Sequence, residues 1–450
     1  MMIQQKQKLL SLNQFLEWPS LSSETNLCID ANDLIIDDQA IFCLGSKLEK
    51  CTNLKTFELW LQGNQISAQN ASVIGLAISK LTDISNMSLY FGVNKLGNKG
   101  TSHLISRLSN CINLSTLNLM LSGNKIGAQG VQGLQDSLEK CINLQNLIID
   151  LGVNQIGNEG TSYIGSALTK CISLTNLSLY LNDTKISAIG ASALSQALEK
   201  CFKLSILNID FRANQIDDEG ISDIGSALAK RTNLLNLTIN FGYNLISDNG
   251  VSRFSQFLEK CINISKLTLS LRKNKIGALG ASNLGLALAK QSNIYDFSID
   301  LGFNSIGDQG VSGLWSGLSK CINISTLNVD LTHNEICDEG PQVLNSSLAK
   351  LSNLKNLQIY LGDNQIGDQS VSGLGFALQS CPQLQKLDLE LYCNEFEDKS
   401  ALAFGLALSK CPYLQIFTAN LGSGLNQQTK FKIKANIFKI KKLIQQRISL

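Results

Sequence analysis

Apolar residues recur along this chain in a 30-residue unit that never slips between residues 51 and 410. Counting Cys51 as position 1, the unit is C-x-N-L-x-x-L-x-L-x-L-x-x-N-x-I-G-x-x-G-x-S-x-L-x-x-A-L-x-K. Positions 7, 9 and 11 alternate with polar residues, as in Leu117, Leu119 and Leu121, which is typical of a strand with one buried face. Positions 24, 27 and 28 carry apolar residues at helical spacing. Each unit therefore predicts a strand followed by a helix.

Strand–helix units that leave no room for hairpins must stack their strands in parallel and place the helices outside the sheet. One unit cannot bury its leucines alone, so neighbouring units close the core between them. Because strands stack about 4.8 Å apart and helices need about 8 to 10 Å, each unit turns by roughly 20 to 30 degrees. The pattern predicts an α/β solenoid, a horseshoe with a parallel β-sheet on its concave face and helices on its convex face.

Two polar positions of the unit have a predicted structural role. Asparagine occupies position 14 in eleven of the twelve units from 51 to 410, where its amide is expected to bond turn backbone groups. Thr184 is the exception, and one hydroxyl should do this less well. Glycine at position 20, as in Gly100, is expected to ease the turn into the helix.

These leucine, asparagine and helical positions make the chain resemble leucine-rich repeat proteins over residues 27 to 425. The long helical half and the Cys or Asn-Leu step into the strand resemble the ribonuclease-inhibitor-like class, although L-x-L-x-L-x-x-N makes the strand or its exit turn longer than usual. The richness in Asn, Ile, Lys and Gln resembles the large repeat families of ciliated protists. The resemblance implies a protein-binding module rather than an enzyme.

The periodicity also predicts how the chain is divided. We expect an N-terminal segment 1–26, a leucine-rich repeat domain 27–425 and a basic C-terminal cap or tail 426–450. The domain itself divides into a degenerate N-terminal cap turn 27–50, twelve full repeats 51–410 and a partial repeat 411–425.

The C-terminal segment 426–450 carries seven positive charges and no acid, so the rest of the chain carries −5 when the net charge is +2. A mildly acidic body argues against nucleic acid as the main ligand. The tail spaces isoleucines as in a helix, with lysines between them. It either caps the last repeat or contacts an anionic membrane surface or an acidic partner. The isoleucines are Ile433, Ile437, Ile440, Ile444 and Ile448.

The thirteen cysteines fit a reduced compartment, since nine of them stand at position 1 and none forms a C-x-x-C group. We interpret them as buried packing residues and expect no metal site; Cys337 and Cys393 lie off this position and are expected to be more exposed. The segment from Met1 to Trp18 lacks the apolar run of a secretory signal, and no apolar stretch is long enough to span a bilayer. The sequence thus predicts a cytoplasmic protein without a transmembrane segment.

Positions 8, 10 and 12 of each strand point away from the core, onto the predicted concave face. Position 10, which we call the strand-end row, holds five acids and four aromatics in twelve units, a composition suited to gripping a basic protein or peptide. Alternatively, strands favour aromatics and acids keep a curved sheet soluble. With two arginines at position 12, the candidate partner-binding residues are Trp60, Tyr90, Asp150, Tyr180, Asp210, Arg212, Arg272, Asp300, Asp330, Tyr360 and Glu390.

No catalytic motif, glycine-rich phosphate loop or cofactor signature is present. The two histidines, His103 and His333, have no nucleophilic partner in a recognisable motif. We therefore expect a non-enzymatic interaction module or scaffold with no cofactor. Two alternatives remain. One is a ribonuclease-inhibitor-like enzyme inhibitor, and the other is a GTPase-activating leucine-rich repeat protein that uses Arg212 or Arg272.

Overall fold

The computed structural model describes residues 8–18, 23–422, 424–440 and 442–449. The chain divides into two compact units, Met1–Gln215 and Ile216–Leu450, and each is described by itself.

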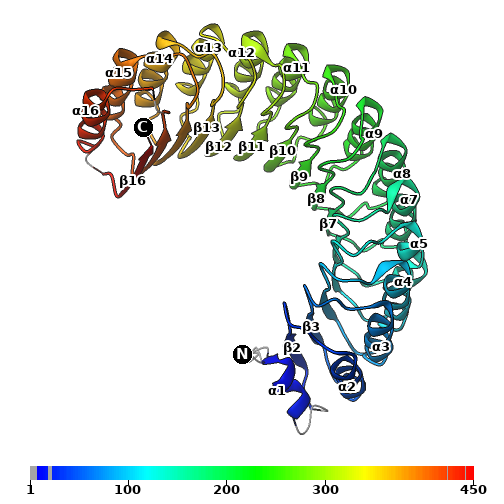
Figure 1. Ribbon diagram of the computed structural model, residues 1–450. Coiled ribbons are helices and arrows are strands. Elements are labelled where there is room, and N and C mark those ends of the chain that lie inside the picture. The colour runs from blue at the N-terminus through cyan, green and yellow to red at the C-terminus, as the bar shows by residue number, and fades with distance from the viewer. Residues whose placement is uncertain (1–7, 19–22, 423, 441, 450) are drawn as a thin grey trace, which may run out of the picture. The chain divides into compact units, whose positions relative to one another are not determined.

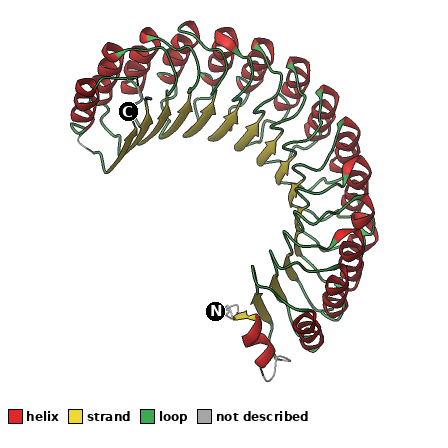
Figure 2. Ribbon diagram, in the orientation of Figure 1, coloured by secondary structure: helices red, strands yellow, loops and turns green. Residues whose placement is uncertain are grey.

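The described part of the first unit contains eight strands that pair in parallel and in chain order, with the helices on the outer side of the sheet (Figure 1, Figure 2). The strands are β1 Lys8–Ser11, β2 Asn26–Asp30, β3 Thr56–Trp60, β4 Asn86–Tyr90, β5 Thr116–Met120, β6 Asn146–Asp150, β7 Asn176–Tyr180 and β8 Ile206–Asp210. The helices are α1 Leu12–Glu17, α2 Asp38–Leu48, α3 Ala68–Ile78, α4 Gly97–Arg107, the 3-10 helix η1 Leu108–Asn110, α5 Ala128–Val131, α6 Leu134–Leu138, α7 Gly157–Leu168 and α8 Ala188–Leu198.

The second unit repeats this arrangement, again with the helices on the outer side of its sheet (Figure 2). Its strands are β9 Asn236–Asn240, β10 Lys266–Ser270, β11 Asp296–Asp300, β12 Thr326–Asp330, β13 Asn356–Tyr360, β14 Lys386–Glu390, β15 Ile416–Asn420 and β16 Gln445–Ser449. Its helices are α9 Asp218–Ala229, α10 Asp248–Leu258, α11 Ala278–Leu288, α12 Gly307–Leu318, α13 Glu339–Leu348, α14 Asp368–Gln379, α15 Asp398–Leu408 and α16 Gln427–Ile437.

The predicted α/β solenoid with a 30-residue repeat is confirmed. Within each unit, neighbouring strands from β2 to β15 pair one repeat apart, so that Trp60 of β3 lies opposite Tyr90 of β4. The alternating leucines fill the core between sheet and helices, and Leu117, Leu119 and Leu121 are at most 1% exposed. Most full-length helices begin at position 17 or 18, before the predicted start at position 20, and end at position 28.

The position-14 asparagines form a ladder that joins consecutive repeats. Asn94 Nδ2 donates to the carbonyl of Phe91 in its own turn (2.9 Å) and to that of Leu61 in the preceding repeat (2.8 Å). Its Oδ1 accepts from the backbone N–H groups of Asn64 (3.0 Å) and Ile66 (2.8 Å). Because these backbone groups are buried, each asparagine removes the cost of leaving them unpaired. The predicted role of this asparagine is confirmed and extends across the repeat boundary.

Thr184 interrupts the ladder, as predicted. Its Oγ1 donates to the carbonyl of Leu181 (2.5 Å) and contacts Asn214 Oδ1 (3.3 Å). Among the described residues, its side chain makes no hydrogen bond to the preceding repeat. The hydroxyl is too short to span that distance.

The predicted role of the position-20 glycine in the turn was wrong. Gly100 lies inside α4, with no positive φ. A Cβ atom there would lie 2.8 Å from the Cα of Ala68, at the start of the preceding helix. The glycine is needed because consecutive repeats approach closely at this point. The left-handed backbone occurs at position 13 instead, where Val93 (φ 54°) and Val153 (φ 55°) adopt it despite their branched side chains.

Repeat-like elements extend into both terminal segments that the sequence set apart. At the start, β1 pairs with β2, so Leu10 lies opposite Ile29. At the end, α16 packs beside α15 and β16 pairs with β15. The tail helix stops at Ile437, and Ile433, Ile437 and Ile440 are buried whereas Ile444 is 80% exposed. Lys441 lies outside the described residues.

Candidate partner-binding surface

The strand-end row occupies the last residue of each strand from β3 to β14. Most of its side chains are half-buried, and Tyr180 is 36% exposed. Two of the predicted residues touch: the rings of Trp60 and Tyr90 meet edge to face, with centroids 5.4 Å apart. The indole N–H of Trp60 donates to Glu58 Oε2 (3.3 Å), and burial raises the pKa of Tyr90. This pair gives the first unit a rigid aromatic surface on its open sheet face.

The aspartates of the strand-end row have a structural role that the sequence did not reveal. Asp150 Oδ1 accepts the backbone N–H of Gly152 (2.9 Å), and Asp210 Oδ1 accepts that of Arg212 (2.9 Å). This Asx turn fixes the exit of the strand and needs an acceptor oxygen, not a charge. The same bond joins Asn240 to Gly242, Asp300 to Gly302, Asp330 to Thr332 and Asn420 to Gly422.

Asp210 and the neighbouring Arg212 illustrate the balance of forces at this turn. Burial raises the pKa of Asp210, while the backbone N–H and the positive charge of Arg212 act in the opposite direction. The Arg212 side chain is exposed. The two candidate residues therefore lie together at the end of β8.

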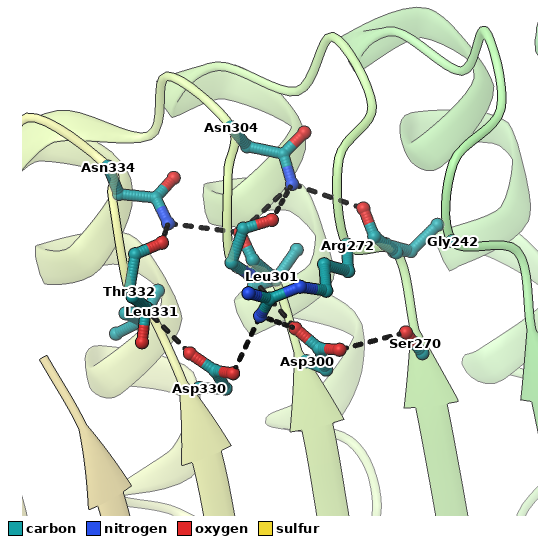
Figure 3. A network of polar contacts seen from close by, with 12 residues as sticks. Gly242, Ser270, Arg272, Asp300, Leu301, Asn304, Asp330, Leu331, Thr332 and Asn334 are labelled. Atoms are coloured by element: carbon teal, nitrogen blue, oxygen red, sulfur yellow. Dashed lines mark hydrogen bonds and ion pairs between the residues drawn. The ribbon is translucent and has the colours of Figure 1, made fainter. Parts of the chain in front are cut away.

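In the second unit three candidate residues form one ion-pair network (Figure 3). The Arg272 guanidinium Nη1 lies 2.9 Å from Asp330 Oδ2 and 3.5 Å from Asp300 Oδ1, and Ser270 Oγ donates to Asp300 Oδ2 (3.1 Å). Burial and the nearby Asp330 carboxylate raise the pKa of Asp300, whereas Arg272 opposes this. Because the single positive charge of Arg272 offsets one of these two negative charges, this part of the row attracts a basic partner less than the sequence suggested.

A stacked row continues from this network along position 13. The guanidinium carbon of Arg272 lies 4.5 Å from the centroid of the Phe303 ring. The Phe303 ring stacks on that of His333, with centroids 4.8 Å apart, and His333 Nδ1 lies 2.6 Å from Asp363 Oδ2. Sequence reasoning considered positions 8, 10 and 12 and missed these residues. The sequence signal that could have revealed them is their shared position 13, just after the exit of each strand.

The remaining candidates lie at the ends of β13 and β14. The Tyr360 hydroxyl donates to Asp388 Oδ2 (3.2 Å), which also accepts from Gln358 Nε2 (3.2 Å). Burial and the Asp388 carboxylate raise the pKa of Tyr360 well above its usual value. Burial likewise raises the pKa of Glu390, and Asp388 adds to this effect. Tyr360 is thus a member of a local acidic cluster and not an isolated anchor.

The cysteines at position 1 are buried, as predicted, and all thirteen cysteines are free thiols. The Cys321 thiol donates to the carbonyl of Leu288, the last residue of α11 (3.1 Å). Burial raises the pKa of Cys171 to about 12. Cys337 and Cys393 are exposed, which confirms the prediction for them. The described residues contain no group of three or more His, Cys, Asp or Glu side chains suited to a metal ion.

A second exposed surface lies at the opposite end of the strands in the first unit. In four consecutive repeats, position 2, in the turn between helix and strand, places an apolar side chain in water, and each is more than half exposed. Sequence reasoning missed this row because it considered only strand positions. The residues, which we call the rim row, are Ile112, Ile142, Ile172 and Phe202.

One family profile agrees with the repeat pattern. The sequence profile of the family described as Leucine Rich repeat matches residues 298–314, within β11 and α12. An internalin (inlF) from Listeria monocytogenes, known from its crystal structure, is similar over 90% of this chain and 88% of that chain, at 21% sequence identity and a TM-score of 0.47. No curated protein sequence matches significantly.

The apolar positions of the matched segment recur along the array, so the fold is that of a leucine-rich repeat solenoid. This class provides modules for protein–protein interaction. Among the described residues, no helix is both long and apolar enough to cross a bilayer.

Proposed function

We propose that this protein is a non-enzymatic interaction module or scaffold that binds a protein or peptide on the open sheet face of the first unit. The observation that supports this most is the edge-to-face pair of Trp60 and Tyr90, followed along the strand-end row by Met120. Large aromatic side chains held rigid by their neighbours lose little entropy on binding, which makes them suited to anchor an interface. Their partial exposure leaves apolar area for a partner to cover.

A basic character of the partner is part of this proposal, but it rests on fewer acids than the sequence suggested. Asp150 lies on the strand next to Met120, and its carboxylate has one oxygen in the Asx turn and one available to a ligand. Asp300 and Asp330 already have Arg272 as their counter-ion. The contacts of a basic ligand are therefore expected around Asp150, Tyr180 and Asp210.

The test is affinity capture followed by binding measurements with the purified partner. We compare the wild type with Trp60→Ala/Tyr90→Ala and with Ile142→Ser/Ile172→Ser, which alters the rim row and leaves the sheet face intact. The proposal expects the first double variant to lose the partner and the second to retain it. Retention by the first and loss by the second would move the interface to the rim row.

We also propose the ribonuclease-inhibitor-like repeat class and a cytoplasmic location. The class is supported by the helices of 10 to 12 residues in most repeats. The location is supported by the free thiols of Cys337 and Cys393, which a reducing compartment preserves.

Of the two alternative functions, inhibition of a ribonuclease is tested by titration against a pancreatic-type enzyme, where unchanged activity removes it. Activation of a GTPase would require a free arginine at the strand exit. Arg272 is held by Asp300 and Asp330, which leaves Arg212 as the residue to change if stimulated hydrolysis is observed.

A further inference from the structure

The second unit contains a positively charged cleft on its helical side, away from the sheet face. The cleft has a volume of about 520 Å³ and lies between α9 and α10. Its lining consists of Ser222, Ser226, Ala229, Lys230, Arg253, Gln256, Phe257 and Lys260. Three of these lining residues are cationic and none is acidic, so the cleft concentrates positive charge.

The repeat explains why the charge gathers here. Position 30 is lysine in most repeats, so a groove between consecutive helices commonly has one lysine at the end of each helix. Arg253 stands at position 23, where the other repeats from 51 to 410 have no lysine or arginine. This arginine, in the middle of α10, adds a third cation to the lining, whereas Lys230 and Lys260 follow the ends of α9 and α10.

Two of the three cations, Arg253 and Lys260, are not neutralised by a neighbouring acid. Among the described residues, neither Arg253 nor Lys260 forms an ion pair. Glu259, which precedes Lys260, instead pairs with Lys290 of the next repeat (2.6 Å). Arg253 and Lys260 are exposed, so their donors are accessible to a ligand in water.

The neutral residues complete a site for an oxyanion. Ser222, Ser226 and Gln256 offer hydroxyl and amide donors beside the cations. Phe257 is buried and its ring centroid lies 5.3 Å from that of Phe254, so a rigid aromatic pair supports this wall of the cleft. A guanidinium matches the geometry of phosphate oxygens with two parallel hydrogen bonds, and ammonium groups add charge without direction.

From this arrangement we propose that the α9–α10 cleft binds a small phosphate-bearing anion, either free in solution or as the headgroup of a lipid. The volume lies within the range of small-molecule sites. The charge favours a ligand with more than one negative charge. This site is independent of the partner-binding surface proposed above, because its residues lie on the helices or in the turns that follow them and not on the strands.

The test measures binding by calorimetry at low and moderate salt, with inorganic phosphate and tripolyphosphate as free probes. Vesicles of phosphatidylcholine with and without a phosphatidylinositol phosphate provide the lipid arm. Arg253→Gln and Lys260→Gln are expected to weaken binding by about tenfold each, the size of one charge-assisted hydrogen bond. Lys320→Gln, at position 30 outside the cleft, is the matched control and should bind like the wild type.

Arg253→Lys separates shape from charge, since it keeps the charge and loses the paired donors; weaker binding by this variant supports recognition of a phosphate. Circular dichroism checks that each variant is folded. The proposal is overturned if no probe saturates, if Lys320→Gln weakens binding as much as Arg253→Gln, or if a phosphoserine peptide binds while no small phosphate or lipid does.

Discussion

The side-chain amide of Asn94 donates to the backbone carbonyl of Leu61, in the preceding repeat, over 2.8 Å. The same bond recurs between Asn124 and Phe91 (2.7 Å) and between Asn334 and Leu301 (3.0 Å). Each asparagine of this ladder therefore holds the strand exit of the repeat before it. Because the ladder links neighbouring repeats, a repeat that lacks the asparagine should be a local weak point of the array.

Thr184→Asn is expected to close the gap in the first unit. The new amide would reach the carbonyl of Leu151 and offer an acceptor to the N–H groups of Asn154 and Ile156. At about 0.5 to 1 kcal/mol for each of these three hydrogen bonds, the free energy of unfolding should rise by about 1.5 to 3 kcal/mol.

The reverse substitution at an intact position, Asn94→Thr, is expected to lower the free energy of unfolding by a similar amount or more, since it leaves buried backbone N–H and carbonyl groups unpaired. Urea unfolding followed by circular dichroism measures both changes. A lower free energy of unfolding for Thr184→Asn would contradict the idea that the asparagine ladder stabilises the array.

Asp150→Asn should leave stability within about 0.5 kcal/mol of the wild type, because the amide oxygen still accepts the Gly152 N–H. Asp150→Ala removes the acceptor and should cost about 1 kcal/mol. If Asp150 also contacts a basic partner, Asp150→Asn weakens that binding without loss of stability. Equal unfolding midpoints for the alanine and asparagine variants would show that the Asx turn contributes nothing.

Asp330→Asn is expected to destabilise the second unit more than Asp300→Asn. Both variants keep the Asx turn, but Asp330 lies 2.9 Å from the Arg272 guanidinium and Asp300 lies 3.5 Å from it. Burial also raises the pKa of Asp300, so losing its charge removes an unfavourable interaction as well as a favourable one. We expect a cost of up to about 1 kcal/mol for Asp330→Asn, measured at low ionic strength. A larger cost for Asp300→Asn would reverse this order.

Val93→Gly should stabilise the first unit by about 0.5 to 1 kcal/mol, because glycine adopts the left-handed backbone without steric cost. Val93 is 62% exposed and has a φ of 54°, so the strain that glycine relieves exceeds the small loss of packing. Gly123 occupies the same position one repeat later, with a φ of 66°. Gly123→Val is the reciprocal change and should be destabilising by about 1 to 2 kcal/mol. Thermal unfolding of both variants provides the comparison, and the same sign of change in both would disprove the strain argument.

Cysteine reactivity should separate the thiols into distinct groups at mildly alkaline pH. Cys393 and Cys337 are exposed and react with a disulfide reagent in the folded protein, Cys337 more slowly because partial burial and nearby carboxylates raise its pKa. Burial raises the pKa of Cys141, Cys321 and Cys381 to about 11, so these thiols stay protonated and unreactive until the protein unfolds.

The same shift predicts how stability depends on pH. The folded pKa of Cys321 lies above the model-compound value of 9.0, so the neutral thiol is favoured in the folded state. The contribution of this thiol to the free energy of unfolding is complete below pH 9.0 and declines as the pH rises toward about 11.

In the reactivity experiment, fast modification of all thirteen thiols in the native state would contradict the burial of the position-1 cysteines.

Much of the fold was determined by the sequence alone. A strict 30-residue period places Leu117 and Leu119 on one face of a strand and the helical leucines on the facing side, and only parallel stacking buries both. The terminal strands β1 and β16 were missed, and β16 buries none of its residues, so it has no apolar alternation to recognise. Gly100 was misinterpreted because its close contact, Ala68, lies in another repeat.

The sequence located the strand-end row, since side chains alternate strictly along a strand, but not what each residue does there. Whether Asp330 holds Arg272, which follows a strand two repeats earlier, depends on a distance of a few ångströms between side chains that lie far apart in the chain. The same holds for the α9–α10 cleft, whose cations come from two consecutive repeats. The periodic burial of apolar residues follows from the local sequence of each repeat, whereas the pairing of charged side chains depends on how the repeats stack.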